Sequence, residues 1–202
     1  MPPVLTFDPG PHEYKLDGKV IPSVSQLCTA GGLWDSFKNN SFVKKRLDPA
    51  IRGIRIHFAT ELMDQGKLDW EQVKGTGYEP YLDAWRNCLA DTGVKIKEIE
   101  VRHHMTLGGC TFAGTVDRVV ETPTGEVEIW DIKTGSDHPD PYSHQLAAYK
   151  ALMEDFLGYE VSKVCCVFID KKGKYRIRDK TGERYDRKWL GICERFAAGE
   201  II

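Results

Sequence analysis

The chain has 202 residues, a formal net charge of −2, 41% hydrophobic residues and 29% charged residues. This length suits one globular domain that needs no disulfides, and the composition excludes a disordered or collagen-like chain. Residues 1–14 lack the basic and apolar regions of a secretion signal, and no apolar run reaches the roughly 18 residues of a membrane-spanning helix. We expect a cytoplasmic protein with no membrane partner.

The first part of the chain predicts a hairpin and then short helices. Residues 11–22 alternate around Asp17–Gly18, which is a strong signal for a hairpin turn. Ser23 is a suitable N-cap for a short helix that ends at Gly31–Gly32, and a second helix is expected over 36–47.

Two longer helices are expected next. Pro49 is favourable at a helix start, and apolar residues recur after it at helical spacing until Gly66. Residues 79–91 predict a further helix that packs Leu82, Trp85 and Leu89. The apolar stripe of the first of these two helices consists of Ile51, Ile54, Phe58 and Leu62.

The second half of the chain changes from helical periodicity to a period of two. Strands are expected at 94–104, 110–121 and 125–133, the last two joined by a tight turn at 123–125. After them we expect a helix over 141–156, with Leu146, Tyr149, Met153 and Phe156 on one side, strands at 161–169 and 174–179, and a helix over 184–198. This order predicts an α/β domain with a mixed sheet.

Positive charge is concentrated in two segments of an otherwise acidic chain. Residues 38–55 carry a net charge of +5 and residues 171–188 a net charge of +6, so the remainder of the chain sums to −13. Such segregation lets a protein attract a polyanion to one face. The alternative is that both segments are ordinary solvated faces.

The six cysteines form no C-x-x-C pair. Two of them are adjacent in a predicted strand, where successive side chains point to opposite faces and cannot easily bind one metal. We therefore expect free, buried thiols in a reducing compartment. The cysteines are Cys28, Cys88, Cys110, Cys165, Cys166 and Cys193.

The segment VEIWDIKTG, residues 127–135, carries the main candidate site. As a strand it places Asp131 and Lys133 on one face, roughly 6–7 Å apart. If the strands on either side of the 123–125 turn pair, residues whose numbers sum to about 246–248 lie opposite each other. Asp117 then comes within reach of Asp131.

Two carboxylates this close are unfavourable unless a cation lies between them. Carboxylate oxygens and a backbone carbonyl suit Mg²⁺ or Mn²⁺, and Lys133 could hold a water or stabilise charge on a phosphate. The alternative is a structural Asp–Lys ion pair on an exposed strand.

Gly114, three residues before Asp117, indicates a close approach of the backbone. Further polar candidates are Gln145 with Tyr149 and His57 with Glu61, each pair at i and i+4 of a helix, and Glu98 and Glu100 on the preceding strand.

In this order and spacing, the residues resemble the PD-(D/E)XK nuclease superfamily, specifically its RecB-like exonuclease branch. The resemblance covers about residues 52–150, and the opening YKLDGKVIPSVSQL is similar to phage-type members of that branch. Val116 stands where the family motif has proline, and no cysteine cluster matches the iron–sulfur centre of some relatives, so we expect no such centre. The matching segments are RGIRIHFATE (52–61), IEV (99–101), GTVD (114–117), DIKTG (131–135) and QLAAY (145–149).

The resemblance implies a restriction-endonuclease-like core, in which helices cover both sides of a central mixed sheet. It further implies a single nuclease domain over residues 1–202, in which a region over about 1–92 packs on a core over about 93–202. Glu100 takes the acidic position before the core, and Glu98 on the same strand face is the alternative. The implied metal ligands are Asp117, Asp131, the Ile132 carbonyl, His57 and Glu100.

The other implied roles concern water and DNA. Lys133 would orient or activate the attacking water and offset charge in the transition state. Gln145 and Tyr149 would steady the site and touch phosphates, and Thr134 would donate to a phosphate. The two basic segments would grip the DNA backbone, through Arg52 in the first and through Lys174, Arg176 and Arg178 in the second.

The implied activity is a metal-dependent DNA exonuclease that uses Mg²⁺ or Mn²⁺ in phage or bacterial DNA recombination, repair or processing. DNA is the expected substrate, a single-strand-annealing or recombination protein is a candidate partner, and the cytoplasm of a bacterial or phage-infected cell is the expected location. One alternative is a catalytically silent DNA-binding module, against which the intact Asp117, Asp131 and Lys133 argue. The others are an endonuclease or an RNA-directed member of the superfamily.

Overall fold

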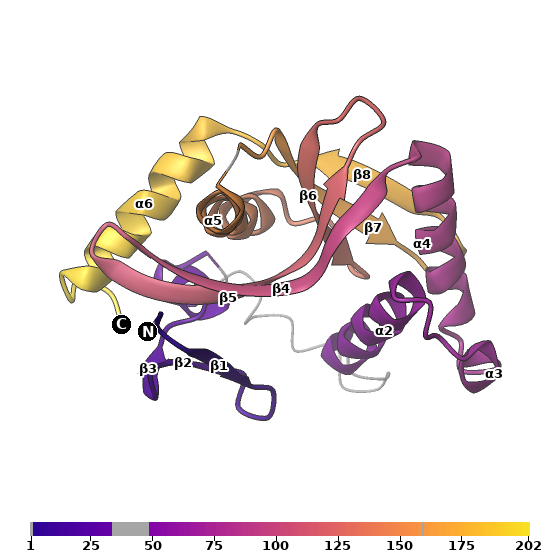
Figure 1. The fold of residues 1–202 in the computed structure, drawn as a ribbon, viewed down its shortest axis with the longest axis horizontal. Coiled ribbons are helices and arrows are strands. Elements are labelled where there is room, and N and C mark those ends of the chain that lie inside the picture. The colour runs from indigo at the N-terminus through magenta and orange to yellow at the C-terminus, as the bar shows by residue number, and fades with distance from the viewer. Residues whose placement is uncertain (1, 34–48, 159) are drawn as a thin grey trace.

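The computed structural model describes residues 2–33, 49–158 and 160–202, which form two β-sheets and a set of helices (Figure 1). The predicted helix over 36–47 and the cations of the first basic segment up to residue 46 lie outside these residues. None of the helices in the described ranges combines the length and the apolar composition that crossing a bilayer requires. The elements are β1 (Leu5–Asp8), β2 (Glu13–Leu16), β3 (Lys19–Ile21), α1 (Val24–Ala30), α2 (Pro49–Asp64), α3 (Trp70–Val73), α4 (Glu79–Thr92), β4 (Lys95–Leu107), β5 (Cys110–Glu121), β6 (Val127–Lys133), α5 (Pro139–Leu157), β7 (Lys163–Ile169), β8 (Tyr175–Asp179) and α6 (Glu183–Ala197).

The central sheet has the strand order β4-β5-β6-β7-β8, and the predicted mixed α/β sheet is confirmed. Neighbouring strands are antiparallel except β6 and β7, which are parallel because α5 carries the chain back along the sheet between them. The β4–β5 hairpin is longer than predicted and extends to the pair Leu107↔Cys110. Its turn is formed by Gly108 and Gly109, whose φ angles of 55° and 79° favour glycine.

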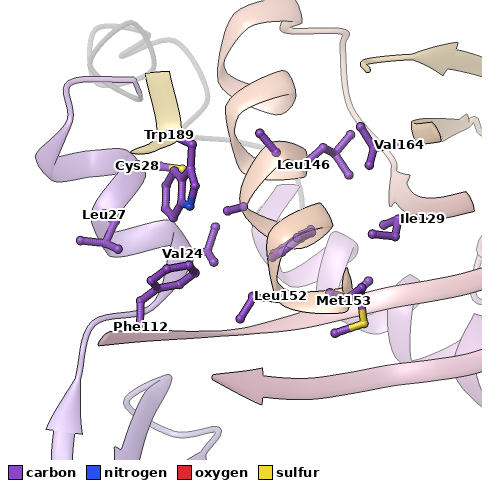
Figure 2. Packing of buried hydrophobic residues seen from close by; sticks show 14 of the residues in the cluster. Val24, Leu27, Cys28, Phe112, Ile129, Leu146, Leu152, Met153, Val164 and Trp189 are labelled. Carbon is purple, nitrogen blue, oxygen red and sulfur yellow. The ribbon is translucent and has the colours of Figure 1, made fainter. Parts of the chain in front are cut away.

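Helices cover both faces of this sheet, as the restriction-endonuclease-like core requires. α1, α5 and α6 pack on one face, and α2 and α4 pack on the other (Figure 1). Alternation along β6 supplies both cores. Ile129 joins the cluster of Leu146 and Trp189 under α5 and α6 (Figure 2), whereas Trp130 points to the other face and packs edge-on against Trp85 at 6.2 Å between ring centroids.

The hairpin predicted over 11–22 forms β2 and β3, and β1, which was not predicted from the sequence, adds a third strand to this N-terminal sheet. The N-terminal sheet is attached to the central sheet at β5. Asp17 and Gly18 both have positive φ and connect β2 to β3 in a two-residue turn. Ser23 caps α1, and its side chain and that of Gln26 satisfy each other's backbone N–H groups. Tyr14 of β2 is buried and its hydroxyl lies 2.6 Å from Thr115 Oγ1 of β5, so this sheet borders the central one.

The apolar stripe predicted for α2 does not face the described core. Ile51, Ile54 and Phe58 are 46%, 70% and 59% exposed, whereas Ile56 and Thr60 are fully buried. Periodicity identifies an apolar face of a helix but not what lies opposite it. The side of α2 that meets the sheet is the one that also carries His57 and polar contacts to β5, as described below.

Helices α4 and α5 have the expected buried faces, with one exception. Leu82 and Trp85 of α4 and Met153 of α5 are fully buried. Phe156, close to the end of α5, is 46% exposed. All six cysteines lie in the described ranges, where they are buried as predicted and form no disulfide.

The close approach predicted at Gly114 is confirmed. A Cβ atom at this position would lie 2.9 Å from Leu152 Cδ1 of α5 and 3.0 Å from Val24 Cγ2 of α1. We expect Gly114→Ala to lower the free energy of unfolding by about 1–3 kcal/mol, because the methyl group overpacks a closed core.

Urea titration measures this effect against a matched control, Gly191→Ala. Gly191 lies inside α6 with open space around it, so alanine there is expected to raise the free energy of unfolding by up to about 1 kcal/mol. Wild-type stability in Gly114→Ala would contradict the close packing of β5 against α1 and α5.

Candidate active site

The candidate site lies where β5 and β6 separate. The two strands pair from their turn up to Arg118↔Trp130, in the register predicted from the sequence. Beyond this pair, β5 continues along β4 and β6 continues along β7. The N–H of Ile132 donates to Asp117 Oδ2 at 2.8 Å, so a side chain holds the strands together where the backbone ladder has ended.

Three elements bring possible metal ligands to this point. His57 of α2, Glu100 of β4 and Asp117 of β5 offer ligand atoms that all lie within 4.8 Å of one another. His57 Nδ1 is 3.3 Å from Asp117 Oδ2. Burial opposes protonation of His57, but Asp117, with a smaller effect of Asp131, outweighs it and raises the pKa of His57 to about 9. Burial alone would raise the pKa of Asp117, and the neighbouring His57 instead lowers it to about 2.

Glu100 is the acidic residue of β4 that lies in this group. Its pKa is raised to about 7, first by burial and then by the charge of Asp117. Glu98 is exposed on the same strand and is outside the group. The two alternatives left open by the sequence are thus separated by position.

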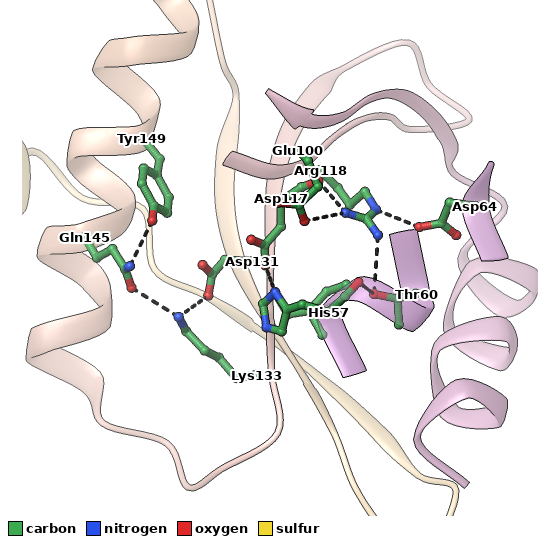
Figure 3. A network of polar contacts seen from close by, with 11 residues as sticks. His57, Thr60, Asp64, Glu100, Asp117, Arg118, Asp131, Lys133, Gln145 and Tyr149 are labelled. Carbon is green, nitrogen blue, oxygen red and sulfur yellow. Dashed lines mark hydrogen bonds and ion pairs between the residues drawn. The ribbon is translucent and has the colours of Figure 1, made fainter. Parts of the chain in front are cut away.

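A chain of polar contacts continues from β6 to α5 (Figure 3). Lys133 Nζ is 2.6 Å from Asp131 Oδ2 and donates to Gln145 Oε1 at 3.1 Å, and Gln145 Nε2 donates to the Tyr149 hydroxyl at 2.9 Å. Burial raises the pKa of Asp131 to about 6 despite the opposing effect of Lys133. Burial would lower the pKa of Lys133, but Asp131 outweighs this effect and raises it. The predicted i, i+4 pair on α5 therefore positions the lysine.

The sequence interpretation missed one buried cation, Arg118. Its side chain has no exposed surface, and its Nε donates to Asp64 Oδ2 at 2.6 Å (Figure 3). Its NH1 donates to Glu100 Oε1 at 3.2 Å and to the Asp117 carbonyl at 2.6 Å. The signal was present, because an arginine within the apolar run of TVDRVV must be buried and therefore paired.

Arg52 and Thr134 lie together beside the site. Arg52 NH2 donates to the Thr134 carbonyl at 3.3 Å, which ties α2 to the segment that follows β6. The Arg52 Nε is buried and has no hydrogen-bond acceptor among the described residues. The hydroxyl of Thr134 comes within 3.9 Å of where a Cβ on Gly53 would lie.

Strand β8 presents Arg176 and Arg178 on the same face of the central sheet as Asp131 and Lys133 of β6. Cys166 and Phe168 of β7 belong to the core on the α5 side, and they pair with Arg178 and Arg176 of β8. The same two β7 residues pair on their other side with Asp131 and Lys133 of β6. Arg178 and Arg176 therefore lie two strands away from Asp131 and Lys133, roughly 10 Å at the usual strand spacing. Lys174 precedes β8 and is exposed.

A family model described as the PD-(D/E)XK nuclease superfamily matches residues 71–199, more than half of the chain. The chain belongs to the PD-(D/E)XK nuclease superfamily. The matched region of this PD-(D/E)XK nuclease chain contains Asp117, Asp131 and Lys133, whereas His57 on α2 precedes it. Among curated proteins, none matches the chain.

Solved structures with similarity to this PD-(D/E)XK chain include two with TM-scores below 0.5. A protein named "Putative exonuclease" from Eubacterium rectale has 14% identity and a TM-score of 0.49, covering 90% of this chain and 83% of its own. SSO0001 has 15% identity and a TM-score of 0.45, covering 86% of this chain and 73% of its own.

PD-(D/E)XK nucleases use divalent metal ions, and the described residues fit such an ion. His57, Glu100 and Asp117 combine an imidazole with two carboxylates, and carboxylate oxygens are the ligands that suit Mg²⁺ and Mn²⁺. Asp131 adds a carboxylate on the neighbouring strand. Its Oδ2 receives no hydrogen bond of suitable geometry from the described residues, and its charge is balanced by the Lys133 ion pair.

The Gln145–Tyr149 contact yields a stability prediction. Tyr149→Phe leaves the buried Gln145 Nε2 without its acceptor, so we expect the free energy of unfolding to fall by about 1–3 kcal/mol. Tyr175→Phe is the matched control, because it removes a tyrosine–carboxylate bond to Asp91 that lies at the surface and should cost less. Chemical denaturation without added metal measures both changes. Equal losses would show that the α5 pair is not held as described.

Proposed function

We propose that this chain is a Mg²⁺- or Mn²⁺-dependent deoxyribonuclease that hydrolyses phosphodiester bonds from DNA ends, as a phage-type member of the RecB-like branch. The observation that carries the proposal is the group of His57, Glu100 and Asp117 beside the ion pair of Asp131 with Lys133. Membership of the nuclease superfamily supports the reaction class, and the ordered sequence motifs support the branch. We assign residues 1–202 to a single nuclease domain.

The metal is assigned to the residues that surround the point where β5 and β6 separate. A bound divalent ion would supply a Lewis acid that makes water more acidic and offsets negative charge on a phosphate. Its proposed ligands are His57, Glu100, Asp117, Asp131 and the carbonyl oxygen of Ile132. We include the Ile132 carbonyl because the hydrogen bond from the Ile132 N–H to Asp117 fixes the backbone of Ile132 beside the other proposed ligands.

Lys133 is assigned to the attacking water and to charge on the phosphate. Its ammonium group is held between Asp131 and Gln145, which fixes the position of its three donors. Tyr149 accepts from the Gln145 amide nitrogen and so fixes which end of that amide faces the lysine. This arrangement supports Gln145 and Tyr149 as residues that orient the lysine and approach the substrate phosphate.

The DNA backbone is assigned to the face that β6, β7 and β8 share. Arg176 and Arg178 lie on the same sheet face as Asp131 and Lys133. Side chains two residues apart along a strand are about 6–7 Å apart, which is close to the spacing of successive phosphates. Lys174 extends this series at the start of β8, and Arg52 and Thr134 provide contacts on the α2 side. Such contacts add affinity without sequence preference.

The biological setting follows from the assigned branch. We place the enzyme in phage or bacterial DNA recombination, repair or processing, in the cytoplasm of a bacterial or phage-infected cell. A single-strand-annealing or recombination protein is the proposed partner, because a nuclease that acts at DNA ends exposes strands that such a protein would take up.

The activity can be tested on an end-labelled linear duplex, a linear single strand, a covalently closed circle and RNA of the same sequence. We expect linear DNA to be degraded with Mg²⁺ or Mn²⁺ and left intact in EDTA, and the closed circle to be spared for lack of an end. Lys133→Ala should remain folded and lose roughly 100-fold or more in rate, since an electrostatic contribution to the transition state is removed. The exposed Lys67→Ala serves as the control and should retain the wild-type rate.

Each alternative reading gives a different result in this assay. Linearisation of a supercoiled circle would indicate an endonuclease, and preferential loss of the RNA would indicate an RNA-directed enzyme. Binding without hydrolysis under every metal condition would indicate a silent module. Equal cleavage in excess EDTA would falsify the metal assignment.

The role of β8 can be separated from the chemistry by salt dependence. Replacing Lys174, Arg176 and Arg178 by alanine should weaken DNA binding and flatten the slope of log affinity against log salt by about two to three, one for each lost phosphate contact. Turnover at saturating DNA should change much less, because the metal group is untouched.

A control variant replaces three exposed lysines outside both basic segments, Lys67, Lys74 and Lys95, by alanine. Binding titrations at several salt concentrations should give this control the wild-type slope. If the β8 variant also retains the wild-type affinity and slope, the segment is an ordinary solvated face.

A further inference from the structure

Glu100 has an unusual backbone conformation for a residue inside a strand. Its φ is 51°, and of the described non-glycine residues with positive φ it is the one that lies within a β-strand. Its neighbours Ile99 and Val101 keep regular pairing with β5. Such a conformation is strained and persists where the surroundings enforce it, commonly at functional sites.

The guanidinium of Arg118 contacts the side chain of Glu100. It donates to Glu100 Oε1 at 3.2 Å and to the backbone carbonyl of Asp117 at 2.6 Å. It also donates to Thr60 Oγ1 at 3.4 Å, and the Thr60 hydroxyl in turn donates to the carbonyl of His57 at 2.8 Å. One planar group thus contacts the three elements that carry His57, Glu100 and Asp117, with contacts on α2, β4 and β5 (Figure 3).

The charge of Arg118 is balanced on the side away from the site. Asp64 Oδ2 accepts from Arg118 Nε at 2.6 Å, and the other oxygen of Asp64 accepts from Trp85 Nε1 at 2.9 Å. The Asp64 side chain is 1% exposed, so this pair is held in low dielectric. The guanidinium therefore orients the carboxylate of Glu100 while its own charge, which would repel a nearby cation, is offset by Asp64.

We propose that Arg118 is a positioning residue that brings Glu100 into the metal group, at the cost of backbone strain at Glu100. Arg118 is fully buried and so acts through Glu100 rather than on DNA. The proposal rests on the proposed function in that it assigns a metal to this group. A planar fork with several donors is needed for these contacts, and lysine lacks it.

The test measures Mn²⁺ binding by calorimetry in the absence of DNA, together with urea stability. We expect Arg118→Lys to bind Mn²⁺ about 10–100-fold more weakly than wild type, which is the usual effect of removing a group that orients metal ligands. Because Arg118 acts through Glu100, the double variant with Glu100→Gln should bind no more weakly than Glu100→Gln alone. Arg86→Lys is the matched control, since its ion pair with Asp83 has the same 2.6 Å length but is exposed.

A separate variant tests the strain without relying on metal. Glu100→Gly and Glu100→Ala both remove the carboxylate that contacts Arg118, and only glycine adopts positive φ freely. In metal-free form, Glu100→Gly should therefore have a higher free energy of unfolding than Glu100→Ala, and it should bind Mn²⁺ as weakly as Glu100→Gln does. If Arg118→Lys does not fold, Asp64→Asn takes its place. It loosens the guanidinium without removing it, and the same loss and non-additivity are expected.

Three results would overturn the inference. Folded Arg118→Lys that binds Mn²⁺ as tightly as wild type would show that Arg118 is structural, as would losses that add fully to those of Glu100→Gln. A Glu100→Gly variant that is no more stable than Glu100→Ala would show that Glu100 is not strained. Wild-type protein that binds no Mn²⁺ would instead refute the metal assignment on which the proposed function depends.

Discussion

The hydrogen bond from the Ile132 N–H to the Asp117 carboxylate is the contact on which the site depends. It occurs where the β5–β6 ladder ends at Arg118↔Trp130, so a buried carboxylate takes an N–H that a neighbouring strand would otherwise satisfy. A buried N–H without an acceptor would cost about 1–3 kcal/mol, which favours keeping an acceptor at this position. The two strands can then separate, and the carboxylates of Asp117 and Asp131 lie on either side of the gap.

Charge balance explains how this acidic group is compatible with a folded chain. Lys133 pairs with Asp131, His57 with Asp117, and Arg118 with both Asp64 and Glu100. Removing one partner of a buried pair leaves an uncompensated charge, which costs more than the pair contributes. His57 and Lys133 thus offset, in the described structure, negative charge that a divalent ion would offset when bound. Arg118 differs from them because it has no exposed surface and its contacts lie among protein groups.

The arrangement of the sheet gives the site its surroundings. Because β6 and β7 are parallel, the helix that connects them, α5, packs on the sheet, and its Gln145 contacts Lys133. Strand β8 continues the same sheet face beyond β7. Arg176 stacks over Phe168 with 5.6 Å between the guanidinium carbon and the ring centroid, and this ring separates the basic strand from the lysine. The chemistry and the basic residues therefore share one face through strand register.

The sequence by itself determined most of the elements, though not β1 or α3, together with the register of β5 with β6 and the order of the acidic and basic residues along the chain. These features depend on local patterns, such as the Asp17–Gly18 turn and the period of two through Asp131 and Lys133, which act over a few residues. It did not determine the buried face of α2, whose exposed apolar stripe looks like a core stripe when periodicity alone is considered. It also could not show that Glu100 rather than Glu98 lies next to His57 and Asp117, because both fit the same strand pattern. Only the tertiary structure showed which side of α2 is buried and which glutamate lies near His57. Both depend on contacts among α2, β4 and β5, which the side chain of Arg118 joins. These elements are far apart in sequence and close together in the fold.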